Sequence, residues 1–175
     1  GGRVSIVRGF FDEPTAAAVA SRPGRHPLVF FCDIRTADEQ TMTEAEISEC
    51  VQCDMQRQRL WAERLQPVVS LLKFRLPWGP GTTRYLPGHL LVQAFPPCTS
   101  TEVRLVVTRE ALCSGEEAVY DHQAHEERLM WHNTVGRARL YDPGVPLTGP
   151  ASAPGLDRCY DCAALAATVR SWVAL

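Results

Sequence analysis

Residues 68–76 read VVSLLKFRL, and residues 28–34 read LVFFCDI. Both are continuous apolar runs of strand length, which is typical of strands buried on both faces of a parallel sheet. The residues between them, 41–65, carry the apolar spacing of a helix, which Pro67 ends. A strand, a helix and a second strand in this order predict a right-handed βαβ unit in an α/β protein.

Further elements are predicted on both sides of this unit. They are a strand over residues 3–11, a helix over 12–21, a Gly/Pro-rich loop over 78–88, strands over 90–95 and 102–108, and helices over 116–134 and 160–175. The two strands after the loop are separated by a short Pro-rich segment, so we expect them to pair antiparallel. The predicted fold class is α/β, with a mostly parallel sheet that contains an antiparallel strand.

A single domain is the expected organisation, because 175 residues are about one domain long. We assign residues 1–141 to this domain, 142–158 to a Pro/Gly-rich linker, and 159–175 to a C-terminal helix that packs on the domain. Hydrophobic residues make up 45% of the chain and charged residues 22%. This is the composition of a globular protein, and it excludes the disordered and fibrous classes.

Charge and cysteine content limit the partners and the compartment. The net charge of −2 provides no global basic field, so any surface that binds nucleic acid must be local. No apolar run has the length of a membrane span, so we expect no membrane partner. Seven widely spread cysteines favour a reducing, intracellular compartment over a disulfide framework. That compartment would be the cytoplasm or a virion for a viral protein, and the nucleus for a cellular one.

Lys73 is the single lysine among 18 Lys and Arg residues. A lysine inside an apolar strand of a chain that otherwise uses arginine indicates a task that arginine does not perform. Burial can lower the pKa of an ammonium, whereas a guanidinium stays charged. The alternative is that biased coding left one lysine by chance.

Two acids are expected to lie close to this lysine. Asp33 ends one predicted strand, Lys73 stands in the C-terminal half of the next, and Glu102 begins a strand that should run antiparallel. Ligands of α/β sheets bind at the carboxyl ends of the strands, where the start of an antiparallel neighbour also lies. The topology therefore predicts that the three side chains converge on one rim of the sheet.

A lysine whose charge state is balanced between two carboxylates and burial can serve, as the amine, as a general base. It could take a proton from a sugar hydroxyl, as transfer of a methyl group to a ribose oxygen requires. The alternative is a structural ion pair between Asp33 and Lys73, and position alone does not separate the two interpretations.

Five short motifs share the order and spacing of a known family. They lie at residues 4–13, 31–36, 67–78, 85–97 and 100–105. With them, residues 3–140 resemble the poxvirus-type cap-specific mRNA 2'-O-methyltransferase family, which also provides the small, processivity subunit of viral poly(A) polymerase. The resemblance implies a Rossmann-like methyltransferase fold, S-adenosylmethionine as the cofactor, capped RNA as the substrate, and a poly(A) polymerase catalytic subunit as a partner.

The resemblance also assigns roles to the charged residues. Asp33, Lys73 and Glu102 match three members of the family's Lys-Asp-Lys-Glu set, with Lys73 as the base that acts on the 2'-hydroxyl. Asp33 and Ile34 fall where the family contacts S-adenosylmethionine, and Phe10 and Phe11 fall near its adenine. The alternative for the two phenylalanines is packing in the core.

A cap-binding site is implied by two further positions. Trp78 matches an aromatic residue that stacks on 7-methylguanine, and a Trp face suits a cationic base. Glu126 matches an acid that reads the guanine edge, although it could equally belong to a solvated helix face. Pro80 and Thr99 replace a second acid and a second aromatic residue of the family. We therefore expect a one-sided pocket that binds the cap more weakly or not at all.

The family's first catalytic lysine and its Gly-rich methionine-binding loop precede the first motif found in this chain. We expect the chain to match the part C-terminal to that loop, with the N-terminal unit missing, and to bind the cofactor poorly alone. It would then be a fragment, a chain completed by another chain, or a degenerate relative. The runner-up function is accordingly a non-catalytic subunit of an RNA-processing complex, such as a polyadenylation processivity factor.

Other residue patterns are weaker. The two C-x-x-C pairs, at 50–53 and 159–162, are too far apart for a usual structural zinc site, so we expect no metal. Three histidines, His122, His125 and His132, share one predicted helix, for which an ordinary amphipathic helix is the favoured interpretation. Arg35 and Arg104 flank the predicted site and are the candidates for contacts with the RNA backbone.

Overall fold

The computed structural model describes residues 4–22, 26–139, 141–142 and 159–175. The chain forms two compact units, each assembled from three segments. The first unit comprises Gly1–Phe74, Arg84–Leu90 and Leu105–Ala118, and the second comprises Arg75–Thr83, Leu91–Arg104 and Val119–Leu175.

The strands form two sheets. One sheet has four strands in the order β1 (Val29–Cys32), β2 (Val69–Phe74), β5 (Val103–Thr108) and β4 (His89–Leu91). The other pairs β3 (Thr82–Tyr85) with β6 (Ala118–Asp121). β1 and β2 run parallel, in a register that matches Val29 with Val69 and ends with Cys32 beside Leu72. The expectation of a mixed α/β chain with a βαβ unit is therefore confirmed.

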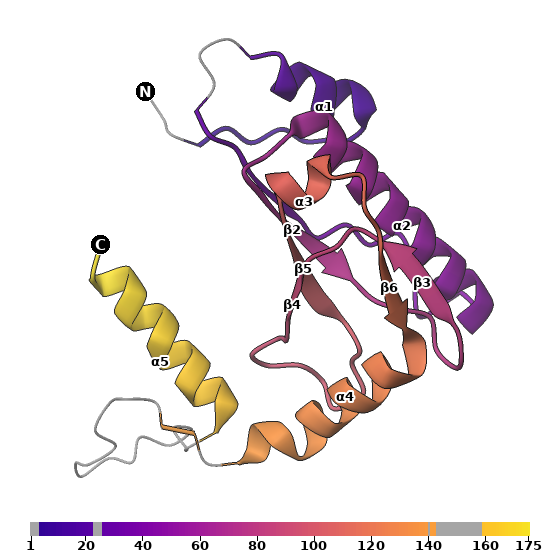
Figure 1. Ribbon diagram of the computed structural model, residues 1–175, viewed down its shortest axis with the longest axis vertical. Coiled ribbons are helices and arrows are strands. Elements are labelled where there is room, and N and C mark those ends of the chain that lie inside the picture. Colours follow the sequence, from indigo (N-terminus) through magenta and orange to yellow (C-terminus); the bar gives the residue numbers. More distant parts are fainter. Residues whose placement is uncertain (1–3, 23–25, 140, 143–158) are drawn as a thin grey trace. The chain divides into compact units, whose positions relative to one another are not determined.

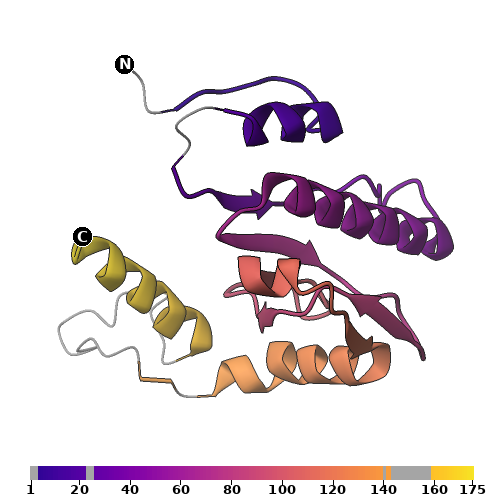
Figure 2. The ribbon, with the colours of Figure 1, turned by 45° about the horizontal axis from the view of Figure 1, so that its top comes forward.

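Local sequence signals define the helix of this βαβ unit, α2 (Glu44–Leu65). Thr43 is its N-cap and forms a capping box with Glu46, which satisfies two main-chain donors that the helix leaves free. The helix ends at Gln66, which adopts a left-handed conformation with φ 48° just before Pro67. α2 packs against β1 and β2, and α1 (Glu13–Ala20), which is capped by Asp12, packs against α2 (Figure 1; Figure 2).

The core of the first unit follows the alternation of β2. Ser70, Leu72 and Phe74 are buried on one face of the strand, whereas the side chains between them are half-buried. Trp61 and Leu65 of α2 are buried as well. Burying a large apolar side chain contributes roughly 1.5–3 kcal/mol, so this face of the sheet stabilises the contact with α2.

The prediction of a strand over residues 3–11 is wrong for the described part, residues 4–11. This segment has no strand conformation, and its apolar side chains Val4, Ile6 and Val7 are at least 80% exposed. Hydrophobicity alone does not make a strand, because a strand also needs a neighbour to pair with. β1 is likewise not buried on both faces, since Val29 and Phe31 are 57% and 60% exposed.

Three further boundaries differ from the sequence prediction. The Gly/Pro-rich stretch 78–88 contains β3, and a short helix, α3 (Arg109–Cys113), follows β5. The predicted helix 116–134 is divided into β6 and α4 (His122–Thr134). The division falls at Asp121, whose carboxylate accepts the N–H of Ala124 at 2.7 Å and so starts the helix there.

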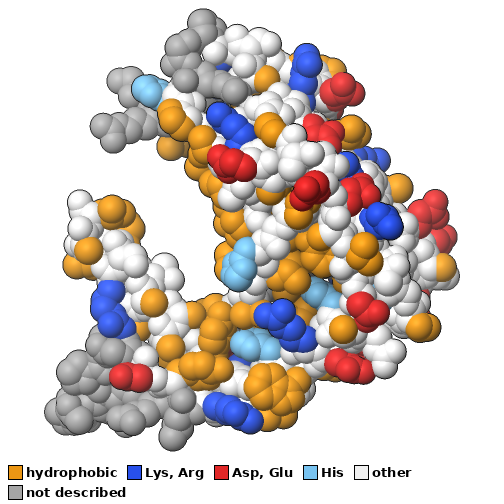
Figure 3. Space-filling model, viewed as in Figure 1, with side chains coloured by type: hydrophobic (Ala, Val, Ile, Leu, Met, Phe, Trp, Pro, Cys, Tyr) orange, Lys and Arg blue, Asp and Glu red, His pale blue; other side chains and the backbone are white. Residues whose placement is uncertain are grey.

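The C-terminal helix is present as α5 (Tyr160–Val173), after a short 3-10 helix, η1 (Gly136–Ala138). Hydrophobic side chains of α5 are visible at the surface in Figure 3; the exposed ones include Leu165, Val169, Trp172 and Val173. Apart from Asp142, the predicted linker at 142–158 lies outside the described residues. Within the described ranges, no helix combines the length and the apolar character needed to cross a membrane.

Candidate functional site

An ion pair joins the ends of the two parallel strands. The register of β1 and β2, continued by one residue beyond Cys32 and Leu72, brings Asp33 level with Lys73. The Nζ atom of Lys73 lies 3.0 Å from a carboxylate oxygen of Asp33. The lysine side chain is 15% exposed and the aspartate side chain 53%. The first two members of the predicted triad are thus together at the carboxyl ends of their strands.

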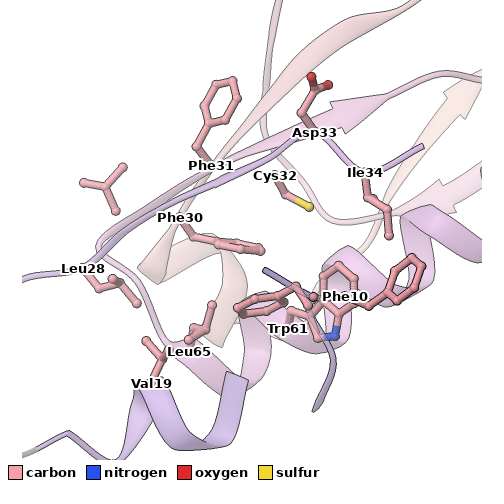
Figure 4. A pocket seen from close by; sticks show the side chains of 13 residues that line it. Phe10, Val19, Leu28, Phe30, Phe31, Cys32, Asp33, Ile34, Trp61 and Leu65 are labelled. Atoms are coloured by element: carbon pink, nitrogen blue, oxygen red, sulfur yellow. The ribbon is translucent and has the colours of Figure 1, made fainter. Parts of the chain in front are cut away.

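The two faces of β1 have different surroundings. In Figure 4 Phe30 and Cys32 point to the side where Trp61 of α2 lies, while Phe31 and Asp33 point to the other side. Because side chains alternate along a strand, Lys73 shares the face of Asp33 rather than the face buried against α2. The charged pair therefore lies on the more open face of the sheet, where a bound molecule could reach it.

Two polar residues of α2, neither of them predicted from the sequence, contact the chain at or just beyond the same strand ends. Gln58 is fully buried, donates to the Lys73 carbonyl at 3.0 Å and accepts the Lys73 N–H at 2.9 Å. Asp54 is 5% exposed and accepts the main-chain N–H of Thr36 at 2.8 Å and its hydroxyl at 2.9 Å. A signal existed in the sequence: an Asp and a Gln spaced i,i+4 on the apolar face of the helix.

A cavity of about 690 Å³ opens beside β1. Its lining includes the four residues that the resemblance assigns to the cofactor: Phe10, Phe11, Asp33 and Ile34 (Figure 4). Phe11 packs edge-to-face on Trp61, with ring centroids 5.1 Å apart, but it is 36% exposed and so lies at the edge of the core. Phe10 is 98% exposed and does not belong to the core.

Glu102 belongs to the second unit, just before β5. Gln93 donates to its carbonyl at 3.0 Å and to its carboxylate at 3.3 Å. A nitrogen of Arg104 lies 3.5 Å from the same carboxylate, and both side chains are largely buried, at 22% and 10% exposed. Glu102 thus faces a cation, Arg104, within its own unit. Its convergence with Asp33 and Lys73 stays a prediction.

The loop before Glu102 is held by donors from α4 and η1. The His125 ring nitrogen Nε2 lies 3.0 Å from the Thr101 carbonyl, and Asn133 donates to the Ser100 carbonyl at 2.7 Å. Arg137 donates to the Pro96 carbonyl at 2.5 Å. Because a carbonyl only accepts, the His125 contact requires the proton on Nε2. Burial lowers the pKa of His125 below its ordinary 6.5, although the contact with Thr101 opposes this shift.

This buried histidine predicts an acid-sensitive fold. In the unfolded chain His125 regains its ordinary pKa of 6.5, so the unfolded state takes up a proton first as the pH falls. The free energy of unfolding should therefore decrease as the pH falls below about 6.5. His125→Gln, which keeps a neutral donor, should show a smaller decrease in urea unfolding between pH 7.5 and 5.5.

His26→Gln supplies the control, because it makes the same substitution at an exposed position. Burial also lowers the pKa of His132, so part of the pH dependence should remain in the His125 variant. An unaltered pH profile in that variant would show that His125 does not carry the effect.

The predicted cap-binding residues lie in the second unit. Trp78 is 41% exposed, and the guanidinium of Arg75 lies 6.0 Å from its ring centroid. The ring face thus already attracts a cation. Glu126 is half-buried on α4, and Thr99, which replaces a family aromatic residue, is exposed. Arg35, a candidate for contact with RNA, is 46% exposed and lies 3.4 Å from Glu39.

The three helical histidines have separate contacts. His122 lies 2.8 Å from the hydroxyl of Thr83, His125 contacts Thr101, and His132 packs against the ring of Tyr160. Each therefore has a local structural partner. In the part of the chain that the structure describes, no group of three or more His, Cys, Asp or Glu side chains could hold a metal ion.

Comparison with known proteins identifies the family. No curated protein matches the chain. A family model described as the poly A polymerase regulatory subunit matches residues 2–142. The match covers the Asp33–Lys73 pair, both residues of α2 that hold the strand ends, and Glu102. The chain therefore belongs to the poly(A) polymerase regulatory subunit family.

Proposed function

We propose that this protein is a regulatory subunit in polyadenylation, which holds RNA for the catalytic subunit of a poly(A) polymerase. Membership of the family over residues 2–142 is the observation that carries this proposal. The near-neutral chain requires a local RNA surface. Arg35 is our first candidate for such a surface. It follows Asp33 by two residues, and its exposed guanidinium could contact phosphate oxygens. Arg104 is our second candidate for the RNA backbone.

The test combines the chain with the poly(A) polymerase catalytic subunit of the same organism. At limiting polymerase, we expect longer poly(A) tails per binding event in the presence of this chain, and co-purification of the two subunits. Arg35→Glu should weaken RNA binding about fivefold at low salt, because it replaces an attraction to phosphate with a repulsion. Unchanged tail lengths together with no detectable RNA binding would contradict the proposal.

Arg22 provides the matched control, since it is also exposed and belongs to the same unit. Arg22→Glu makes the same change in net charge away from the strand ends. It should therefore lower RNA affinity less than Arg35→Glu does. Equal losses would indicate that RNA responds only to net charge.

A second candidate function is transfer of a methyl group to the ribose 2'-oxygen of the cap-proximal nucleotide of capped mRNA. The Asp33–Lys73 pair at the carboxyl ends of β1 and β2 favours it, because Rossmann-like folds place their chemistry at this edge. The aromatic cavity beside the pair is the second supporting observation. Under this proposal the four-stranded sheet, β1-β2-β5-β4, corresponds to the sheet of a Rossmann-like methyltransferase.

The cavity suits the nucleoside part of S-adenosylmethionine. Phe10, Phe31 and Ile34 give it an apolar lining that fits a flat adenine, and the Asp33 carboxylate can accept hydrogen bonds from ribose hydroxyls. Among the described residues that line the cavity, none has a basic side chain that would pair with the methionine carboxylate. The residues therefore fit the nucleoside, and the amino-acid part would need donors from elsewhere.

Lys73 would provide the base in this reaction. The bound cofactor would supply a methyl group, whose bond to sulfur breaks as a bond to the ribose oxygen forms, leaving a neutral thioether. Lys73, in its amine form, would take the proton that the 2'-hydroxyl loses. Asp33 would orient Nζ from 3.0 Å and stabilise the ammonium that results. Glu102 would complete the charge environment if it converges on the pair as predicted.

A further inference from the structure

The short distance between the Lys73 ammonium and the Asp33 carboxylate needs an explanation, because the pairing of β1 with β2 ends one residue before them. The last matched residues are Cys32 and Leu72. Asp33 and Lys73 come one step later, where the β1–β2 pairing no longer fixes the distance between the chains. Their ion pair at 3.0 Å is nevertheless well formed. Contacts outside the β1–β2 pairing therefore contribute to the distance between these two chain segments.

Helix α2 supplies such contacts through two buried polar side chains. Gln58 bonds both the N–H and the carbonyl of Lys73, at 2.9 and 3.0 Å, as a neighbouring strand would. Asp54 bonds the N–H and the hydroxyl of Thr36, at 2.8 and 2.9 Å, and so fixes the segment that leaves β1 three residues after Asp33. Gln58 and Asp54 thus each form two hydrogen bonds with a single residue, Lys73 and Thr36 respectively.

Asp54 and Gln58 lie one turn apart on the same face of α2, so a rigid element connects the two contacts. Both are almost fully buried, at 5% and 0% exposed. Burying such groups is costly unless they are hydrogen-bonded, and an apolar side chain would suffice for packing alone. Arg57, 3.1 Å from Asp54, offsets the buried negative charge.

We propose that Asp54 and Gln58 are positioning residues, which set the distance between the Asp33 carboxylate and the Lys73 ammonium by fixing the ends of β1 and β2 to one helix. This proposal deepens the methyl-transfer candidate, because a general base must stand within hydrogen-bond reach of its proton. Neither residue touches substrate in this role; both act through Lys73 and Asp33.

The single lysine makes the test selective. ¹³C-formaldehyde with cyanoborohydride methylates only Lys73 and the α-amino group of the chain, and NMR separates the two signals. In Gln58→Met, which keeps the volume but loses both bonds, we expect Lys73 to react about fivefold faster than in the parent chain, because an amine less tightly held by a carboxylate is more reactive. Asp54→Asn should change the rate in the same direction.

Tyr85→Phe is the matched control. It removes another buried hydrogen bond to α2, the 2.6 Å bond from the Tyr85 hydroxyl to the Met55 carbonyl, and keeps the ring that packs against Phe74 at the end of β2. This variant should lower the unfolding temperature yet leave the Lys73 rate within about twofold of the parent rate. A similar rise in Tyr85→Phe, or an unchanged rate in a folded Gln58→Met variant, would overturn the positioning role.

If Gln58→Met does not fold, a measurement on the parent chain can still test the positioning role. Hydrogen exchange of the Gln58 side-chain amide should be strongly protected by its bond to the Lys73 carbonyl, and rapid exchange would overturn the proposal. None of these measurements requires RNA, cofactor or polymerase. A protein that transfers no methyl group could therefore still show that Asp54 and Gln58 position Lys73. Conversely, if the Lys73 reactivity does not change, the methyl-transfer proposal is still tested separately by the methyl-transfer assay.

Discussion

Replacing Lys73 with arginine is expected to reduce methyl transfer to capped RNA about a thousandfold, in an assembly that is otherwise active. A positioned general base contributes about 10²–10⁴ in rate, and a guanidinium cannot give up its proton to become one. The substitution keeps the positive charge beside Asp33, so the fold should survive. The measurement is single-turnover transfer of a labelled methyl group.

Cap affinity and thermal stability are the controls for this prediction. Lys73→Arg should leave cap affinity and the unfolding temperature close to those of the parent protein, because Trp78 and the buried face of β2 are unchanged. Retained methyl transfer in the arginine variant would remove Lys73 as the base and leave Asp33–Lys73 as a structural ion pair. The regulatory role in polyadenylation does not depend on this result.

Trp78→Ala should produce the second large effect. Loss of the indole face is expected to weaken binding of a 7-methylguanosine cap about tenfold, because a cationic base stacked on Trp gains up to about 2 kcal/mol. An unmethylated cap should lose much less. Titration of both cap analogues by fluorescence measures the difference, and equal losses would argue against stacking on a cation.

Arg75 makes this prediction more specific. Its guanidinium lies 6.0 Å from the Trp78 ring, so a cationic base must compete with it for the same electron-rich face. Arg75→Gln should therefore strengthen binding of the methylated cap relative to the unmethylated one. If Arg75→Gln weakens both equally, Arg75 acts through a phosphate contact instead.

The sequence was informative where one segment carried several independent signals. Helix α2 had apolar spacing and a proline just after its end, and its predicted bounds, 41–65, were close to the observed Glu44–Leu65. The pairing of Asp33 with Lys73 followed from the βαβ topology, because parallel neighbours end at the same edge. Membership of the family was likewise visible in five ordered motifs.

The sequence was misleading where hydrophobicity stood alone. Residues 4–11 and the stretch before α4 show why, since strand formation depends on neighbours and helix starts depend on caps such as Asp121. Gln58 stands one turn from Asp54 on the apolar face of α2, but its sequence position does not reveal which main-chain groups its side chain bonds. Only the structure shows that it takes the place of a strand beside Lys73.

The point at which β1 and β2 separate has a mechanical consequence. Their paired residues end at Cys32 and Leu72, one step short of the charged side chains. Under the proposed positioning role, the distance between Asp33 and Lys73 depends on the contacts of Asp54 and Gln58, which lie outside the β1–β2 pairs. A substitution in α2 could therefore change this distance while every β1–β2 pair stays intact.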